Sequence, residues 1–327
     1  MPKTKASDTP DLFSVSDLEE ARARLPATVR RVVEVGGDIR QDPPDRANFL
    51  HSALCQVGMP RKKTEGRTFE QESGSVSIML EAGRLWNGRK FIEQPLPYGT
   101  RPRLVMVHIS SEAVRTQSQT IEIGESMRDF LIKLGIDPTG GARGNYTMFK
   151  KQMEALAACR MTMGMTDGAR AITVETKPIK RFEAWVTFDG KQRDLWPGEL
   201  GLREEFFQTL ARHAVPLDPR ALGALKHSAL ALDIYTWLAH RLCRIRKANG
   251  VKLSWGNLRD QFGQEYRDPR NFKREFRRAL RQVRAVYPEA HTEDAIGGGI
   301  ALKPSKPPYP RRRFKPSVGN LLIERRF

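Results

Sequence analysis

Hydrophobic and polar positions separate most sharply in the segment from Pro269 to Tyr287. At about 100° per residue, one side of a helix over this segment collects its apolar and aromatic residues, Phe272, Phe276, Ala279, Leu280, Val283 and Tyr287. The other side collects seven cations, Arg270, Lys273, Arg274, Arg277, Arg278, Arg281 and Arg284, with Glu275 at its edge. The pattern predicts an amphipathic helix whose apolar face packs in a core.

A solvent-exposed helix is the alternative interpretation of any charged face. Exposed helices usually mix the two signs, so that charges four positions apart attract each other. Here nearly all the charges are positive, and a bound anion relieves their mutual repulsion. The face therefore favours a polyanion, such as nucleic acid, as its partner.

The residues around this helix predict a definite order of elements. A long helix over Ser228–Arg246 precedes a short strand over Val251–Leu253. A helix capped by Ser254 and then the basic helix follow. The order ends with a hairpin whose strands lie in Ala290–Ile296 and Ile300–Pro304.

The same order of elements recurs earlier in the chain, without residue identity. Its predicted elements are a helix over Pro102–Thr116, a strand over Thr120–Ile123, a helix capped by Ser126, a third helix, a hairpin that turns at Asp167–Gly168, and a further strand over Arg181–Phe188. The buried face of the third helix is predicted to hold Tyr146, Phe149, Met153, Leu156 and Arg160, and its outer face Thr147, Lys150, Lys151 and Ala158.

A helix-turn-helix followed by a β-hairpin is the element order of a winged helix. In this fold the third helix enters the major groove, while the hairpin contacts the neighbouring backbone or minor groove. Most cations then contact phosphates, and a few reach guanine edges. The predicted DNA-contacting residues are the seven cations of the basic helix together with Arg143, Asn145, Thr147, Lys150, Lys151 and Arg170.

The predicted fold class is α+β, with two tandem winged-helix domains. The predicted parts of the chain are a polar, partly helical and partly disordered extension over 1–48, a mixed α/β segment over 49–97, winged-helix domains over 98–190 and 199–308, and a basic tail over 309–327. Within the first two parts we expect a helix over Ser16–Arg24, a loop over Gln41–Ala47, a short helix over Phe49–Cys55 and a strand-like stretch over Ser75–Gly83.

Composition adds a strong charge to this picture. The 327 residues include 56 Lys and Arg against 38 Asp and Glu, for a formal charge of +18, which attracts polyanions at long range. A polybasic protein on a membrane surface fits the charge too, but no apolar run approaches the ~18 residues of a spanning helix. The amino terminus lacks the apolar stretch of a signal peptide. We expect a cytoplasmic protein without membrane contact.

Candidate catalytic groups are few. The segment Gly83–Lys90 has the two-glycine spacing of a P-loop but lacks the Gly-Lys-Ser/Thr ending, so it indicates a turn. The six histidines form no His-x-His pair, and Cys55, Cys159 and Cys243 form no Cys-x-x-Cys pair. We expect no enzymatic activity, no cofactor and no metal.

Four longer segments carry a family likeness: CQVGMPRKKTEGRTFE (Cys55–Glu70), QPLPYGTRPRLVMVHISSEAVRTQS (Gln94–Ser118), FLIKLGIDPTGGARGNYTMFKKQMEALAACRMT (Phe130–Thr162) and ALDIYTWLAHRL (Ala231–Leu242). Together they resemble the plasmid-encoded RepA replication initiator family over roughly residues 49–308. The resemblance implies a non-enzymatic initiator with paired winged-helix domains that binds repeated sites, or iterons, in double-stranded DNA at a plasmid origin. By analogy with related initiators, it also implies opening of the duplex, recruitment of host helicase and initiator proteins, and a homodimer that represses its own promoter.

Two other classes of function share some of these features. A winged-helix transcriptional repressor has the same fold and charge but no role in initiation. An origin nickase or recombinase needs a nucleophile, and Tyr146, Tyr235 and Tyr287 all lie on predicted apolar faces. The sequence therefore favours an initiator, with a repressor as the alternative.

Overall fold

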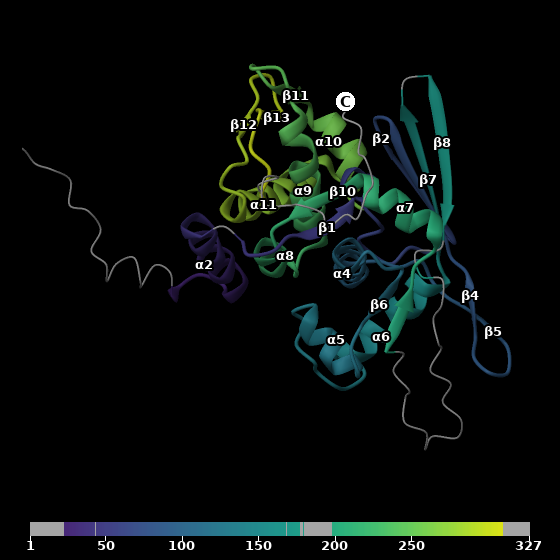
Figure 1. Cartoon of the computed structure of the whole chain (residues 1–327). Helices are drawn as coiled ribbons and strands as arrows, with labels where there is room; N and C mark the ends of the chain where they lie inside the picture. The colour runs from purple at the N-terminus through teal and green to yellow at the C-terminus, as the bar shows by residue number, and fades with distance from the viewer. Residues whose placement is uncertain (1–22, 43, 168, 177–178, 180–197, 310–327) are drawn as a thin grey trace, which may run out of the picture.

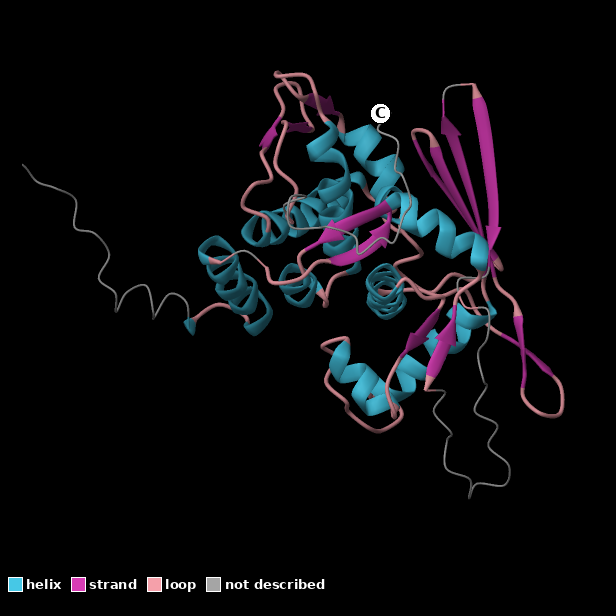
Figure 2. Ribbon diagram, viewed as in Figure 1, coloured by secondary structure: helices cyan, strands magenta, loops and turns pink. Residues whose placement is uncertain are grey.

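The structure, a computed structural model, describes residues 23–42, 44–167, 169–176, 179 and 198–309. Helices and small antiparallel sheets make up this part of the chain (Figures 1 and 2). The expectation of a mixed α+β protein is confirmed. The predicted strand over Arg181–Phe188, the basic tail beyond Tyr309 and all but the last two residues of the predicted helix over Ser16–Arg24 lie outside the described residues.

The carboxyl-terminal part contains the predicted elements in the predicted order. They are α9 (Ala229–Arg241), which continues into the short η1 (Leu242–Arg244), then β11 (Val251–Leu253), α10 (Trp255–Phe262), α11 (Pro269–Val286), β12 (Thr292–Asp294) and β13 (Ile300–Leu302). The Ser254 hydroxyl caps α10 by accepting the Asn257 N–H at 3.1 Å. β13 lies between β11 and β12 in a three-stranded sheet.

The earlier copy also has the predicted order, but its strands pair differently. It comprises α4 (Thr100–Thr116), β6 (Thr120–Glu122), α5 (Met127–Lys133), α6 (Asn145–Ala158), β7 (Arg160–Asp167) and β8 (Arg170–Thr176). β6 pairs with β9 (Glu199–Gly201), away from the β7–β8 hairpin. That hairpin instead extends β2 (Thr68–Ser73) and β3 (Val76–Glu81) into a four-stranded sheet of order β2-β3-β7-β8.

Two expectations for α6 are wrong. Ala158 is buried, although the pattern placed it outward, because the chain turns there from the helix into the sheet. Arg160 is the first residue of β7 and therefore does not share the helical face of Phe149, Met153 and Leu156. Those three side chains are buried as predicted.

The segment before α4 differs from the expectation in two places. A helix, α2 (Ala27–Gln41), lies within the part expected to be a polar extension. Phe49–Cys55, expected to be helical, begins as the strand β1 (Asn48–His51) and becomes helical only in α3 (Ser52–Gln56). β1 has buried residues at three successive positions, so it lacks the alternation that marks a strand.

The two predicted winged-helix domains share one hydrophobic core. β1 pairs with β10 (Ala214–Leu217), which follows α7 (Glu204–His213) and precedes α8 (Pro219–Leu225). The core includes Met106 of α4, Phe206 of α7, and Trp237 of α9. The domain boundaries stay a prediction, and the structure shows extensive contact across them.

A separate hairpin leaves the body of the molecule. β4 (Arg84–Trp86) and β5 (Phe91–Glu93) pair with each other alone among the described strands, and their tip points away from the core (Figure 1). The turn predicted at Gly83–Lys90 is confirmed as the bend of this hairpin. None of the helices in the described ranges is long and apolar enough to span a membrane.

Candidate nucleic-acid interface

α11 carries the largest group of predicted contact residues. The Asp268 carboxylate caps it by accepting the Arg270 N–H at 2.8 Å, and Pro269 takes the first helical position. Its buried face consists of Phe272, Phe276, Ala279, Leu280, Val283 and Val286. The helix therefore has the apolar face that the sequence predicts.

Aromatic rings fill the space beneath α11. The fully buried Phe276 ring lies 5.9 Å from Trp255 and 5.6 Å from Phe262, measured between ring centroids. Phe272 lies 5.6 Å from both Phe276 and Tyr266. Tilted and edge-on aromatic pairs at these distances add stabilisation beyond the area they bury. These contacts join α11 to α10 and to the loop between them.

The seven cations of α11, here called the basic ridge, lie on the side away from these rings. Arg270, Arg274, Arg278, Arg281 and Arg284 are exposed. Lys273 and Arg277 are half-buried because they lie over the Trp255 ring, 5.1 and 5.2 Å from its centroid. The ring orders two cations at the edge of an otherwise solvated surface.

Few carboxylates neutralise the basic ridge. Glu275 pairs with Arg274 at 3.2 Å and with Arg278 at 3.6 Å, and Asp294 of β12 pairs with Arg277 at 3.3 Å. Such exposed pairs contribute little to stability, about 0–1 kcal/mol. Within the part of the chain that the structure describes, the other ridge cations, Arg270, Lys273, Arg281 and Arg284, make no ion pair. Seven positive charges against two negative charges leave a net of five.

A hairpin flanks the ridge on one side. The loop between β12 and β13 contains Gly297, Gly298 and Gly299, all with positive φ. A Cβ on Gly299 would lie 1.9 Å from the Leu253 carbonyl oxygen, so only glycine fits beside β11. This close approach fixes the loop against the sheet that borders α11.

The helix α2, which the sequence reading missed, flanks the other side. A Cβ on Gly36 would lie 2.3 Å from the Ala285 carbonyl oxygen, so the two helices touch through backbone atoms. Arg40 of α2 lines a hollow with Arg281, Arg284, His291 and Lys303. Val32, Val35 and Ile39 recur at helical spacing and pack on the core, so their periodicity contained the signal for this helix.

The contact residues predicted in the earlier copy have mixed surroundings. The Asn145 side chain donates to the Asp137 carbonyl at 2.8 Å and accepts from Arg101 at 2.6 Å. The Thr147 hydroxyl donates to the Gly141 carbonyl at 2.9 Å. Both side chains therefore hold the loop before α6.

The remaining residues of that set lie on or beside α6 and β8. Arg143 and Lys151 are exposed, and Lys150 is half-buried. Arg170 is the first residue of β8, and its side chain lies outside the described part of the structure. In Figure 1 α6 lies low, near α5 and β6, whereas α11 lies at the upper left beside α2. The fold thus gathers the basic ridge on one surface and places the earlier set on another.

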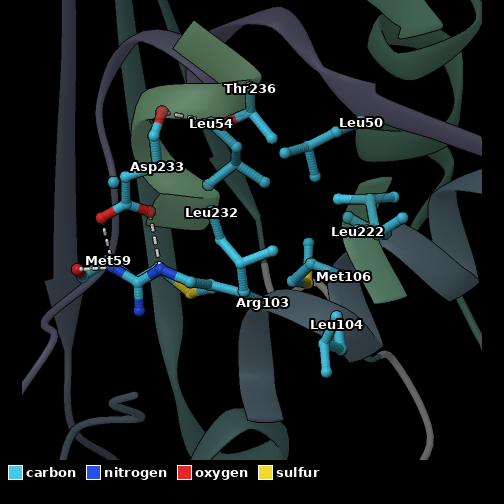
Figure 3. Close-up of a pocket in the computed structure, with 12 residues that line it drawn as sticks. Leu50, Leu54, Met59, Arg103, Leu104, Met106, Leu222, Leu232, Asp233 and Thr236 are labelled. Atoms are coloured by element: carbon cyan, nitrogen blue, oxygen red, sulfur yellow. Dashed lines mark hydrogen bonds and ion pairs between the residues drawn. The ribbon is translucent and has the colours of Figure 1, made fainter. Parts of the chain in front are cut away.

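A buried ionic cluster lies between the two copies. Asp233 of α9 accepts two hydrogen bonds from Arg103 of α4, at 2.6 and 2.9 Å (Figure 3). It accepts a further one from Arg61 at 2.9 Å. Arg61 also pairs with Glu265 at 2.7 Å. Arg103 donates further to the Met59, Pro60 and Gly99 carbonyls. Sequence reading missed this cluster because its members are far apart in the chain.

The cavity beside this cluster is small. Apolar side chains such as Leu50, Leu54 and Leu232 line it, and its volume of about 20 Å³ holds about one water molecule (Figure 3). Among the described residues, no group of three or more His, Cys, Asp or Glu side chains is arranged to hold a metal ion. The cavity is part of the packing between α4 and α9.

No curated protein sequence matches the chain significantly. Among solved structures, a crystal structure of selenomethionine derivatives of domains 2 and 3 of RctB is similar, with 14% sequence identity and a TM-score of 0.44. That similarity covers 75% of this chain and 88% of the RctB chain.

The family model of the plasmid encoded RepA protein, RepA_C, matches residues 96–257. This range runs from just before α4 into α10. It contains, wholly or almost wholly, three of the four segments that carry the family likeness. The match is narrower than the range of 49–308 that the sequence likeness indicates. Over residues 96–257, the chain is therefore similar to the family of plasmid encoded RepA proteins.

Proposed function

We propose that this protein initiates plasmid replication by binding repeated sequences in double-stranded DNA at the origin. The basic ridge is the observation that carries the proposal, since it presents seven cations on a helix anchored by buried aromatic rings. The match of residues 96–257 to the RepA family model supports the plasmid context. The protein would act in the cytoplasm, without enzymatic chemistry of its own.

The elements around α11 support a winged-helix mode of binding. α9, β11, α10, α11, β12 and β13 follow the winged-helix order, with β13 between the other two strands. An α-helix with its side chains is about 10–12 Å wide, which suits a major groove about 12 Å wide. α11 would then enter the major groove, and the β12–β13 hairpin would lie over the neighbouring backbone.

The ridge cations would divide between bases and phosphates. Arg270, Lys273, Arg274 and Arg277 occupy the first half of α11 and would reach base edges. Arg278, Arg281 and Arg284 occupy its second half and would contact phosphates. Arg40 lies close enough to Arg281 and Arg284 to join the phosphate contacts.

The earlier copy of the element order would supply a second contact with the repeat. Arg143, Lys150 and Lys151 of the earlier copy would contact DNA, with Arg170 at the hairpin, while Asn145 and Thr147 would set the loop that positions them. Two linked modules bind a repeat more tightly than either alone, because the first contact raises the effective concentration of the second. Opening of the duplex, recruitment of host helicase and initiator proteins, and a homodimer belong to the same proposal.

Footprinting of the purified protein on its plasmid origin tests the proposal. We expect protection at regularly spaced repeats, with base-specific protection in the major groove. Loss of protection in a variant with Arg274→Ala and Arg277→Ala, but not in one with Arg203→Ala and Arg212→Ala near α7, would assign the contact to α11. Binding to random DNA as tight as binding to the origin would contradict the proposal.

Plasmid maintenance distinguishes an initiator from a repressor. A plasmid that carries the origin but not the gene is placed in cells that supply this protein from elsewhere. An initiator maintains the plasmid, and the ridge variant loses it. Repression of a promoter without plasmid maintenance would favour the repressor.

A further inference from the structure

The hairpin of β4 and β5 exposes two large aromatic side chains side by side. Trp86 is 50% exposed and Phe91 is 65% exposed, and they face each other across the two strands. Their ring centroids are 5.2 Å apart in an edge-on arrangement. Most large aromatic residues of the described chain are buried, so this pair is a conspicuous apolar site on the surface.

The tip of this hairpin is well defined and basic. The Asn87 side-chain oxygen accepts the N–H groups of Arg89 and Lys90 at 3.0 and 2.8 Å, and Gly88 takes a positive φ of 90°. Arg89 and Lys90 are exposed and, within the described residues, make no ion pair. The aromatic pair therefore has two unneutralised cations next to it.

The one carboxylate of the hairpin is already neutralised. Glu93 pairs with Arg84 at 2.8 Å and with Arg67 at 3.1 Å. Counting Arg67, Arg84, Arg89 and Lys90 against Glu93, the local charge is 4 − 1 = +3. A negatively charged partner with flat apolar groups fits this surface best.

We propose that the β4–β5 hairpin binds single-stranded DNA. Unpaired bases stack on Trp86 and Phe91, and the phosphates between them lie near Arg89 and Lys90. A duplex does not offer this contact, because its bases are already stacked and paired. The inference rests on the proposed function in one respect: the opening of an origin supplies the single-stranded DNA.

The hairpin is separate from the basic ridge. In Figure 1 it projects at the lower right, while α11 lies at the upper left beside α2. One molecule can therefore hold a duplex on α11 and an unpaired strand on the hairpin together. This arrangement would keep an opened strand close to the repeats that the protein occupies.

Cross-strand packing is the competing explanation of the aromatic pair, because facing side chains stabilise a two-stranded hairpin. Substitution by valine separates the two explanations, since valine favours a strand but offers no ring to a base. The double variant Trp86→Val/Phe91→Val should keep the hairpin and lose the stacking. The variant Trp86→Tyr should keep both.

The experiment measures the affinity of the full chain for a labelled oligothymidylate and for an origin duplex. We expect the valine variant to bind the oligothymidylate about 5- to 150-fold more weakly for each stacked base, and the tyrosine variant to bind close to wild type. The affinity of the valine variant for the origin duplex should not change. The matched control is Ile172→Thr, which removes another exposed apolar side chain, 46% exposed in β8, and should leave both affinities unchanged.

Charge and crosslinking give independent readings. The variant Arg89→Gln/Lys90→Gln should flatten the salt dependence of oligothymidylate binding by about 1.4 units of log K against log salt, at ~0.7 per phosphate. Photocrosslinking of 5-iodouracil DNA to the wild-type protein should label the peptide that contains Trp86 and Phe91. This measurement does not depend on the folding of any variant.

Unchanged oligothymidylate affinity in the valine variant, or crosslinks confined to other segments, would overturn the inference. In that case the aromatic pair serves the hairpin itself or a protein partner. Absence of duplex binding in the wild-type protein would count against the proposed function instead. The inference that the hairpin binds single-stranded DNA would still stand.

Discussion

Phe276 shows at the scale of one residue how the basic ridge is held. Its side chain is fully buried among the rings of Trp255, Phe262 and Phe272. Phe276→Ala should lower the free energy of unfolding by about 3–5 kcal/mol, because it removes a whole ring and leaves a cavity. Urea denaturation followed by circular dichroism measures the change.

The control for that substitution is Ile296→Ala. Ile296 is 95% exposed in the loop between β12 and β13, so its loss should change the free energy of unfolding by no more than about 0.5 kcal/mol. A Phe276→Ala protein as stable as the wild type would mean that α11 does not pack through this face.

His51 makes stability depend on pH. It is fully buried, its ring lies 5.6 Å from His213, and its Nδ1 accepts the Ala53 N–H. Burial, with a smaller contribution from the nearby His213, lowers the pKa of His51 from 6.5 to about 3. Between pH 6.5 and about pH 3, the unfolded chain therefore binds a proton at His51 that the folded protein does not bind.

The sign of the effect follows from that difference. The contribution of His51 to stability is complete above about pH 6.5 and is lost as the pH falls toward 3. The free energy of unfolding then decreases by about 1 kcal/mol per pH unit. His51→Asn keeps an acceptor for the Ala53 N–H but does not titrate, so the unfolding free energy of the variant should fall less steeply between pH 7 and pH 5 than that of the wild type. An identical slope would contradict the assignment.

At the scale of the element, the proposed contact of α11 with DNA should make the affinity for DNA depend on salt. Each phosphate that a cation neutralises contributes about −0.9 to the slope of log K against log salt. Replacement of Arg278 and Arg281 by alanine should flatten the slope for duplex binding by about one to two units. Titration of binding at several salt concentrations measures it.

The matched control removes the same charge elsewhere. Arg203→Ala/Arg212→Ala takes two exposed arginines from the region of α7 and should leave the slope unchanged. If both double variants flatten it equally, the effect comes from net charge and not from contact with α11.

Elements with a periodic pattern were predictable from sequence. α11 combines a helical period with a capping aspartate and proline, so its start and its faces follow from local residues. β1 could not be found this way, because it is buried over successive positions and its partner β10 lies far along the chain. The pairing of β6 with β9 was also hidden, since three-residue strands carry too little pattern to choose a partner.

The positions of the predicted contact residues in the fold could be predicted only in part, for the same reason. Cations on α11 stand on one face of a single helix, and the period alone places them together. The side chains of Asn145 and Thr147 donate hydrogen bonds to the loop before α6, and a periodic pattern in the sequence does not predict the shape of that loop. Arg40 meets the ridge only because α2 packs on α11.

At the scale of the whole molecule, Asp233 joins the two copies. It is buried and neutralises both Arg61 and Arg103, so its loss leaves the buried Arg103 without a carboxylate partner and Arg61 with Glu265 alone. Asp233→Asn should lower the free energy of unfolding by about 3–5 kcal/mol. Urea denaturation followed by both tryptophan fluorescence and circular dichroism measures the loss.

An exposed ion pair provides the comparison for Asp233. Glu293 and Lys303 are 2.6 Å apart but largely solvated, so Glu293→Gln should cost less than about 1 kcal/mol. Equal losses in the two variants would mean that the cluster between α4 and α9 contributes no more than a surface pair.

The Asp233 cluster also constrains the geometry of any DNA that the protein contacts at two places. Since an ion pair and a common core join α4 and α9, we expect the angle between α6 and α11 to change little when the protein binds its target. A duplex turns once in about 10–10.5 base pairs, so an insertion of roughly 5 base pairs between two contacted half-sites carries the second one to the far side of the helix. Such an insertion should abolish joint binding, and an insertion of one full turn should do the same, because it moves the second half-site about 34–36 Å along the axis, beyond the reach of a rigid protein.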